Sequence, residues 1–408
     1  MNRLLAEYRM LASCSREMRS LLLANAIYAL VLPVIEIFVA AYVLRNSQHA
    51  SKVLVYQLCI YAATPVAFLV NGYLLRLVPV NYLYAAGVLL SGGALVVLMT
   101  ADVKTAMGIA VSGGLMGLAT GIFWANRGFL ALSTTTDANR NYFYGIETCI
   151  ITITSVVVPL GVGALLELAG SRDHFAGEGL SFGYRYVAAA SLLLTIVAAA
   201  ALLRGEFRNP PVDRFVFFRF EPLWYRLLGF AALRGVAQGY IITAPALLIL
   251  RLVGQEGVLG KIEAVGSCVA AVGLYVTGRM SKREHRVRVL AVALLLFLAG
   301  SVANAALFDA LGVLIFMGCL LLAKPLIDLA YYPIQFHTVD VVSRLEGRSE
   351  YAYILNHELG LFAGRFVGCT LFIVIAVWFS ETDALRYALP IVAILQLPAI
   401  LLARRLMA

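Results

Sequence analysis

The sequence predicts an all-α polytopic membrane protein with about twelve transmembrane helices, and three observations support this fold class. Of the 408 residues, 62% are apolar and only 13% are charged, and the mean hydropathy of +0.87 is far above that of a soluble chain. A span needs about 20 residues to cross about 30 Å of hydrocarbon, so a dozen spans leave only short loops. Stretches such as 289–308 are apolar on every face, unlike the alternating strands of an outer-membrane barrel.

Charged and turn-forming clusters divide the chain into twelve expected helices. The first six cover residues 20–44, 52–75, 81–101, 105–133, 142–169 and 184–204. The second six cover residues 223–250, 257–279, 289–308, 311–336, 350–379 and 387–404. Between the two sets lies the segment from Arg204 to Arg226, with five arginines and Asn209-Pro210-Pro211, which is too polar to cross a membrane and too broken by proline to form one helix. We expect an N-terminal six-helix bundle at 1–204, a cytoplasmic linker at 205–222 and a C-terminal bundle at 223–408.

Basic residues favour a cytoplasmic location for both ends of the chain. With twelve spans, the loops on the side of the termini carry twenty Lys and Arg residues and the opposite loops carry seven. The positive-inside rule places the richer side in the cytoplasm. The short loops favour a bacterial inner membrane, and the first apolar run lacks the cleavage site of a signal peptide. Because the charges are dispersed among apolar runs, we expect a lipid bilayer and no nucleic acid as partner.

An internal repeat favours two pseudosymmetric halves. An offset of 206 residues relates Arg45 to Arg251 and Gly72 to Gly278. The matches keep their order along the chain, as a duplicated six-helix unit would.

Ionisable residues inside the spans indicate which helices face the interior. A charge in hydrocarbon costs about 2.5 to 3.5 kcal/mol on insertion scales, so such residues face a cavity or one another. They occur in the first, fourth, fifth, seventh, tenth and eleventh expected spans, whereas every third span has an apolar centre.

This distribution resembles the major facilitator superfamily, in which two six-helix halves surround a cavity lined chiefly by helices one, four, seven and ten. The family motif between helices two and three begins with Gly, followed four residues later by Asp and then by Arg. Gly72 matches, but Arg76 stands at the Asp position; Gly278 and Arg283 match in the second half, with Lys282 at the Asp position. The resemblance implies a transporter that works by alternating access.

Polar residues at the cytoplasmic half of the fourth span form the first candidate site. Trp124 and Arg127 share one helix face, with Asn126 beside them, and this face suits an aromatic wall and a cation. Arg127 and Glu147 lie at matching depth on adjacent antiparallel helices, which predicts an ion pair. This pair either removes two charges from lipid or takes part in transport. Gly113, Gly117 and Gly121 of the same span indicate close helix packing.

Glu36 in the first span is the candidate proton-coupling carboxyl. Asn25 and Glu36 are eleven residues apart, about 20° from eclipsed on a regular helix, so we expect one inward-facing polar stripe. With no basic residue near it in the sequence, an isolated Glu36 would exchange a proton near neutral pH.

The tenth, eleventh and seventh spans supply a candidate cationic centre. Lys324 and Arg365, with Arg234 and Gln238 in the seventh span, would suit a carboxylate or phosphate ligand.

Two carboxylates compete with that interpretation. Asp328 follows Lys324 at the spacing of an intrahelical pair, and Glu358 shares a helix face with Arg365. Lys261 and Glu263 of the eighth span are expected to snorkel to the interface.

No enzyme signature, cofactor motif or metal-ligand spacing occurs, so no enzyme, cofactor or metal is expected. The six cysteines form no Cys-x-x-Cys pair and predict reduced thiols. The sequence therefore predicts a monomeric, proton-coupled secondary transporter for a small anionic or zwitterionic solute. A lipid or amphipathic drug translocase of the same fold and a non-transporting membrane receptor or scaffold are the alternatives.

The topology is testable with reporters fused near Asn209, near Gly177 and after Ala408. We expect alkaline phosphatase to be inactive and green fluorescent protein to be fluorescent at Asn209 and Ala408, with the opposite pattern at Gly177, because the positive-inside rule places only Gly177 outside. A fluorescent fusion at Gly177 would overturn this topology.

Overall fold

The computed structural model describes residues 15–134, 137–171, 178–205, 207, 209, 215–254, 256–280, 285–348 and 350–407, and it is helical throughout these residues apart from short connections. The first half contains α2 (Arg16–Tyr28), η1 (Val34–Phe38), α3 (Val39–Ser47), α4 (Ala50–Leu74), α5 (Val80–Thr100), α6 (Ala106–Thr134), α7 (Asp137–Ser171) and α8 (Glu178–Leu203). The second half contains α9 (Pro222–Ile241), α10 (Ala244–Leu252), α11 (Glu256–Met280), α12 (Arg286–Leu307), α13 (Ala310–Glu346), α14 (Glu350–Trp378), α15 (Glu381–Gln396) and α16 (Ala399–Met407).

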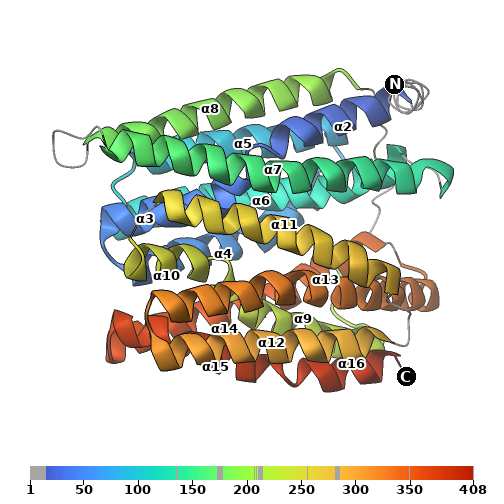
Figure 1. Cartoon of the computed structure of the whole chain (residues 1–408). Coiled ribbons are helices and arrows are strands. Elements are labelled where there is room, and N and C mark those ends of the chain that lie inside the picture. The colour runs from blue at the N-terminus through green and yellow to red at the C-terminus, as the bar shows by residue number, and fades with distance from the viewer. Residues whose placement is uncertain are drawn as a thin grey trace, which may run out of the picture.

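The helices form the two six-helix bundles that the sequence predicts. In Figure 1 most helices of the first half lie above those of the second half, whereas α11 of the second half lies beside α7, and all of them run in roughly one direction. Among the described residues, ten segments are long and apolar enough to cross a membrane. The chain is an integral membrane protein.

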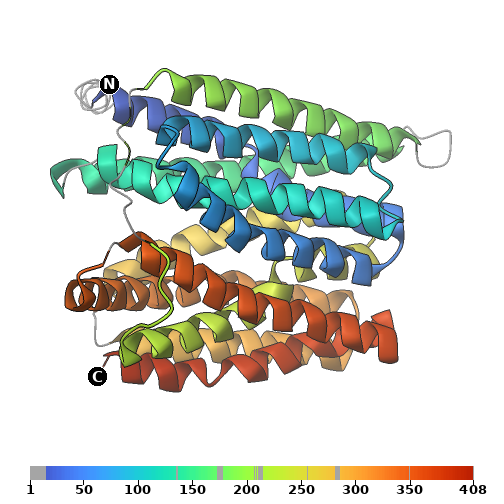
Figure 2. The ribbon, with the colours of Figure 1, turned by 180° about the vertical axis from the view of Figure 1, so that it is seen from behind.

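Both described ends of the chain lie at the same end of the molecule, on the right in Figure 1 and on the left in the reversed view of Figure 2. We call this the terminal end and the opposite one the distal end. Lys282 and Arg283 of the second loop motif lie outside the described residues.

Three of the twelve spans are interrupted, which the sequence analysis did not predict. The first span consists of α2, the π-helix η1 and α3, the seventh of α9 and α10, and the twelfth of α15 and α16. Pro33, Pro245 and Pro398 lie at or directly beside these interruptions. Each proline lacks an N–H group and clashes with the preceding turn, so the helical ladder is broken there.

The tenth span, α13, ends ten residues later than the predicted Phe336, at Glu346. Its end is set by Gly347, which adopts a left-handed conformation with φ of 61° and caps the helix as glycine commonly does. The polar residues after Phe336 therefore extend the helix instead of ending it.

Close helix contacts within each half depend on glycine. Gly113, Gly117 and Gly121 face α4, and a Cβ at Gly117 would meet the carbonyl oxygen of Ile60. Gly364 and its neighbours on α14 approach the backbone of α9 in the same way. Small residues permit this approach where lipid provides no hydrophobic driving force.

Fewer helix pairs make contact between the two halves than within each half. The main contacts join α7 to α11 and α4 to α14, and shorter ones join α3 to α10. The contact between α4 and α14 includes a hydrogen bond of 2.6 Å from the Tyr351 hydroxyl to the Phe68 carbonyl oxygen.

We expect Gly117→Leu to lower the apparent melting temperature of purified protein clearly, because overpacking a close contact costs about 1 to 3 kcal/mol. Gly114→Leu is the matched control, since a Cβ at Gly114 meets no atom within 4 Å. Equal melting temperatures for the two variants, measured by size-exclusion chromatography after heating, would contradict the packing role of Gly117.

Candidate functional site

A polar network in the first half contains the predicted ion pair. Arg127 Nη2 lies 2.6 Å from Glu147 Oε2, and Arg127 Nε lies 3.2 Å from Oε1. Asn25 donates to the same carboxylate at 2.8 Å and accepts a hydrogen bond of 2.8 Å from the Tyr84 hydroxyl. Four helices therefore converge on one buried carboxylate, and Asn25 and Tyr84 are members that the ion-pair prediction did not include.

The two other residues predicted beside Arg127 have different surroundings. Trp124 is 45% exposed, and the Arg127 guanidinium lies 5.3 Å from its ring centroid. Asn126 is fully buried, and its amide exchanges two hydrogen bonds with Asn71 of α4. Trp124 is thus exposed, whereas Asn126 joins α6 to α4.

In the second half, Arg234 has its own carboxylate. Its Nη2 lies 2.5 Å from Asp328 Oδ1. The guanidinium also lies between two rings, 4.1 Å from the centroid of Tyr331 and 4.9 Å from that of Tyr332. The predicted intrahelical pair of Lys324 and Asp328 is not formed, because the arginine on α9 is the closer partner.

Arg365 is paired as its helical spacing suggested. Its Nη1 lies 2.5 Å from Glu358 Oε1, and its Nε donates to Gln238 Oε1 at 3.0 Å. Its guanidinium lies 4.8 Å from the Tyr61 ring centroid, and Tyr61 donates to the Gln238 carbonyl at 2.9 Å. Because Tyr61 belongs to the first half, this network touches both halves near mid-membrane.

The prediction of a cationic centre with unpaired charges is therefore wrong. Glu358 and Asp328 neutralise Arg365 and Arg234, and of the three predicted cations Lys324 alone has no ion pair within 4 Å among the described residues.

Lys324 belongs instead to a cluster between the halves. Its side chain is exposed, and the charges of Glu36, Asp328 and Glu263 act on it. Glu36 and Glu263 also act on one another. We call Glu36, Glu263 and Lys324 the central cluster. The expectation that Glu36 has no charged neighbour is wrong, and so is the snorkelling assigned to Glu263, because Glu263 of α11 and Lys324 of α13 lie near enough to Glu36 of η1 for their charges to interact.

The predicted stripe of Asn25 and Glu36 is also wrong. Asn25 is buried inside the first half, whereas Glu36 is exposed within η1. The π-helix and the turn before it change the number of residues per turn, so the angular relation of a regular helix is lost. π-Helical segments of this kind are frequent at functional sites.

Lys261 matches its expected exposed position and lies 3.5 Å from Glu167 of α7. Among the described residues, no three His, Cys, Asp or Glu side chains gather closely enough to hold a metal ion.

Comparison with known proteins identifies the class of fold. No known family model matches the chain. It is 22% identical over 392 residues to YqgE, an uncharacterized protein of Bacillus subtilis (strain 168), and the match covers 92% of this chain and 86% of that protein.

Two kinds of solved structure resemble the chain over nearly its whole length. A bacterial homologue of the iron transporter ferroportin, in an inward-facing state, has a TM-score of 0.69 at 15% identity and covers 96% of this chain and 99% of its own. A bacterial homologue of the human lysosomal transporter Spinster, inward-facing and unoccupied, has a TM-score of 0.68 at 14% identity and covers 96% of both chains. The chain has the major facilitator superfamily fold, as its sequence predicted.

The Arg127–Glu147 contact yields a test of the first network. We expect Arg127→Met and Glu147→Gln each to lower expression and stability strongly, since removing one partner of a buried pair costs about 3 to 5 kcal/mol. Together the two changes should restore much of the loss, because no unpaired charge remains. Fluorescence-detected size exclusion provides the measurement; additive losses in the double variant would show that the two charges do not depend on each other.

Proposed function

We propose that this protein is a secondary active transporter that moves a small solute by alternating access of its two halves. The fold supports this proposal, and the resembling solved structures are transporters. The single observation that carries it is the central cluster, whose ionisable side chains lie between the halves. Binding sites of such transporters lie near the bilayer midplane, at the interface of the repeats.

The arrangement of ion pairs supports an inward-facing state. In the described residues, the ion pairs that join the halves are Arg45–Glu256, His49–Glu381 and Glu167–Lys261. All three lie at the distal end, which the charge distribution predicts to be external. Both resembling transporters were solved in inward-facing states.

Proton coupling is part of the proposal. The central cluster has two carboxylates for one ammonium, so its fully ionised form has a surplus negative charge. Binding of one proton would balance this charge. Glu36, exposed in the π-helical segment, is the carboxyl that we assign to proton exchange, and movement of the halves would change its distance from Lys324.

The charge balance favours a zwitterionic solute over a simple anion. Within each half, Arg127, Arg234 and Arg365 are already paired with carboxylates. A zwitterion would place its cationic group near Glu36 and Glu263 and its anionic group near Lys324. Trp124 supplies an exposed aromatic surface on α6.

A lipid or amphipathic-compound translocase is the second candidate. It is favoured by large exposed aromatic side chains on α6 and α13, namely Trp124, Tyr332 and Phe336. The rings of Tyr332 and Phe336 are stacked 6.3 Å apart. A thermal-shift screen that includes both zwitterionic metabolites and amphiphiles distinguishes the candidates, because a bound ligand raises the apparent stability. A receptor or scaffold would bind a ligand without moving it into vesicles.

The remaining properties follow from the sequence. We propose a monomer in a bacterial inner membrane with both termini in the cytoplasm, and protons and a small molecule as its partners.

We expect Glu36→Gln to abolish pH-driven accumulation of the solute that the screen selects while counterflow continues. The amide preserves shape and hydrogen bonding but cannot exchange a proton. Both rates are measured in proteoliposomes with and without an imposed pH gradient. Asp102→Asn, in an exposed distal loop, is the control and should behave as the unaltered protein. Accumulation by Glu36→Gln at the original rate would remove Glu36 from the coupling mechanism.

A further inference from the structure

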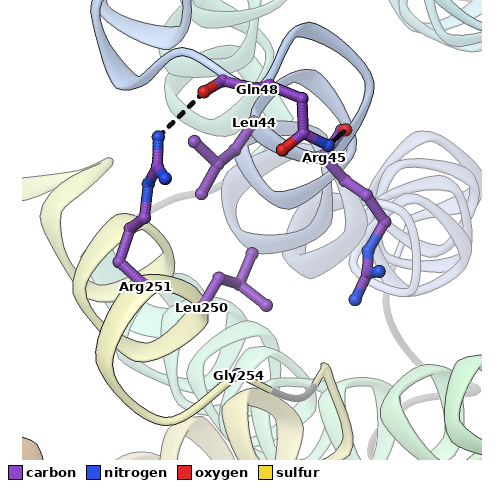
Figure 3. A pocket seen from close by; sticks show the side chains of 6 residues that line it. All are labelled: Leu44, Arg45, Gln48, Leu250, Arg251 and Gly254. Carbon is purple, nitrogen blue, oxygen red and sulfur yellow. Dashed lines mark hydrogen bonds between the residues drawn. The ribbon is translucent and has the colours of Figure 1, made fainter.

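The distal end contains a small cavity whose lining follows the internal repeat. The cavity has a volume of about 190 Å³, and its lining residues are Leu44, Arg45, Gln48, Leu250, Arg251 and Gly254 (Figure 3). The offset of 206 residues that relates Arg45 to Arg251 also relates Leu44 to Leu250 and Gln48 to Gly254. The lining thus consists of three equivalent pairs, one member from each half, as a cavity on the internal pseudo-twofold axis requires.

The local backbone has the same symmetry. α3 and α10 each contain nine residues, and each carries its arginine in the last turn. The chain leaves α3 at Gln48 with φ of 60° and leaves the turn after α10 at Gly254 with φ of 95°. The repeated sequence therefore builds the same helix end twice, and the two ends face each other across the cavity.

Arg45, the arginine of the first half, has a carboxylate partner in the second half. Arg45 contacts Glu256, the first residue of α11, with distances of 2.5 Å and 2.7 Å between its two nitrogens and the two carboxylate oxygens. Applied backwards, the offset takes Glu256 to Ala50, the first residue of α4. Alanine cannot provide the equivalent carboxylate for Arg251.

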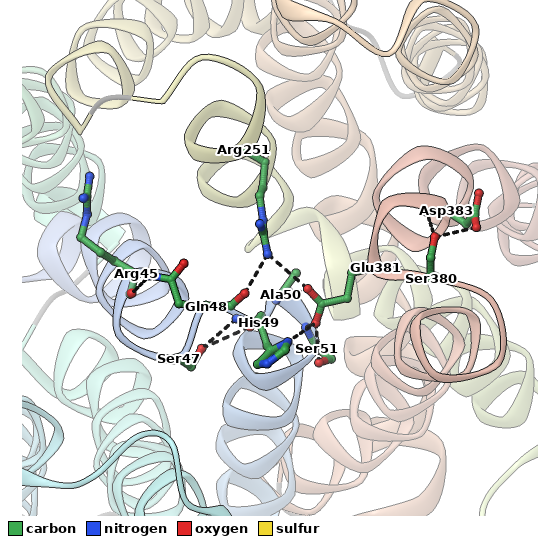
Figure 4. Close-up of polar contacts among 10 residues, drawn as sticks. All are labelled: Arg45, Ser47, Gln48, His49, Ala50, Ser51, Arg251, Ser380, Glu381 and Asp383. Carbon is green, nitrogen blue, oxygen red and sulfur yellow. Dashed lines mark hydrogen bonds and ion pairs between the residues drawn. The ribbon is translucent and has the colours of Figure 1, made fainter.

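Glu381 of the twelfth span occupies the place of this missing carboxylate (Figure 4). It accepts hydrogen bonds from the backbone N–H groups of Ala50 at 3.1 Å and Ser51 at 3.2 Å, and from the Ser51 hydroxyl at 2.8 Å. Arg251 lies 3.2 Å from the same carboxylate and donates to the Gln48 carbonyl at 2.8 Å. A negative group at the N-terminus of α4 is also favoured by the helix dipole.

We propose that Arg45, Glu256, Arg251 and Glu381 form a pseudosymmetric latch that holds the distal ends of the two halves together. The contacts of Arg45 with Glu256, of Arg251 with Gln48 and of Glu381 with α4 all cross from one half to the other. Glu381 is a positioning residue that replaces a carboxylate absent from the first repeat. This inference deepens the proposed transport function, because release of the latch is the step that opens the distal end.

The arginine side of the latch is open to solvent, which suits contacts that break during a cycle. The side chains of Arg45 and Arg251 are 42% and 40% exposed, whereas those of Glu256 and Glu381 are 6% and 23% exposed. Exposed ion pairs typically change an equilibrium constant by only about 1.4- to 5-fold each. Several such contacts together stabilise the form that is closed at the distal end, yet each one can be broken at a small cost in free energy.

The test measures the distance between the halves and needs no solute. Spin labels are attached at Lys104→Cys and Ala310→Cys, which are exposed positions at the distal ends of the two halves, after replacement of the native cysteines. Pulsed electron paramagnetic resonance in lipid nanodiscs then reports the distance distribution. We expect the combination of Arg45→Ala and Glu381→Ala to increase the population of longer distances about tenfold, as the loss of two or more exposed contacts predicts.

Two further variants make the result specific. A variant that carries both Arg45→Glu and Glu256→Arg should show the shorter distance of the unaltered protein, because the pair is formed again with reversed charges. Arg386→Ala is the matched control, since Arg386 also lies at the distal end but donates to Ala305 within its own half at 2.6 Å, and it should leave the distribution unchanged.

An unchanged distribution in the Arg45 and Glu381 variant, or an equal shift in the Arg386 variant, would overturn the latch. Longer distances in a protein that moves no solute would support the latch and contradict the transport function instead.

Discussion

The pairing of charges in a medium of low dielectric constant is the constraint on which the rest of this structure depends. In each half, arginines within the spans are held by carboxylates of the same half: Arg127 by Glu147, Arg234 by Asp328 and Arg365 by Glu358. An unpaired charge at such a depth is expensive. The ion pairs themselves therefore each lie within one half, which favours movement of each half as a rigid unit, although Tyr61 of the first half also contacts Gln238 and Arg365 of the second.

Polar groups that join the halves have a different character. The central cluster is an incompletely balanced set of charges, and the distal latch is partly exposed to solvent. Interactions of this kind can be exchanged at a modest cost, unlike those inside the halves. The interrupted first and seventh spans place both sets at the interface, because η1 carries Glu36 and the short helices α3 and α10 carry the latch arginines.

The sequence predicted what depends on regular periodicity. The pairs Arg127–Glu147 and Glu358–Arg365 could be inferred from matching depth and from helical spacing, and the apolar runs located twelve spans. It did not predict Arg234–Asp328, because i, i+4 spacing favoured Lys324 and the contact depends on how α9 packs against α13. The direction in which Glu36 points could not be predicted, because the π-helix changes the number of residues per turn. Glu381 gave no signal, since it lies 130 residues from Arg251 and substitutes for a residue absent from the repeat; only the match of Arg45 to Arg251 pointed to that region.

The most direct test of this account is a cryo-electron microscopy structure of the distal-open state, stabilised by a conformation-selective antibody fragment. The account predicts that Arg127–Glu147, Arg234–Asp328 and Glu358–Arg365 remain within ion-pair distance, while Arg45 and Glu256 separate and Lys324 moves relative to Glu36. A distal-open structure in which the pairs inside the halves are broken and the contacts between the halves are kept would contradict it.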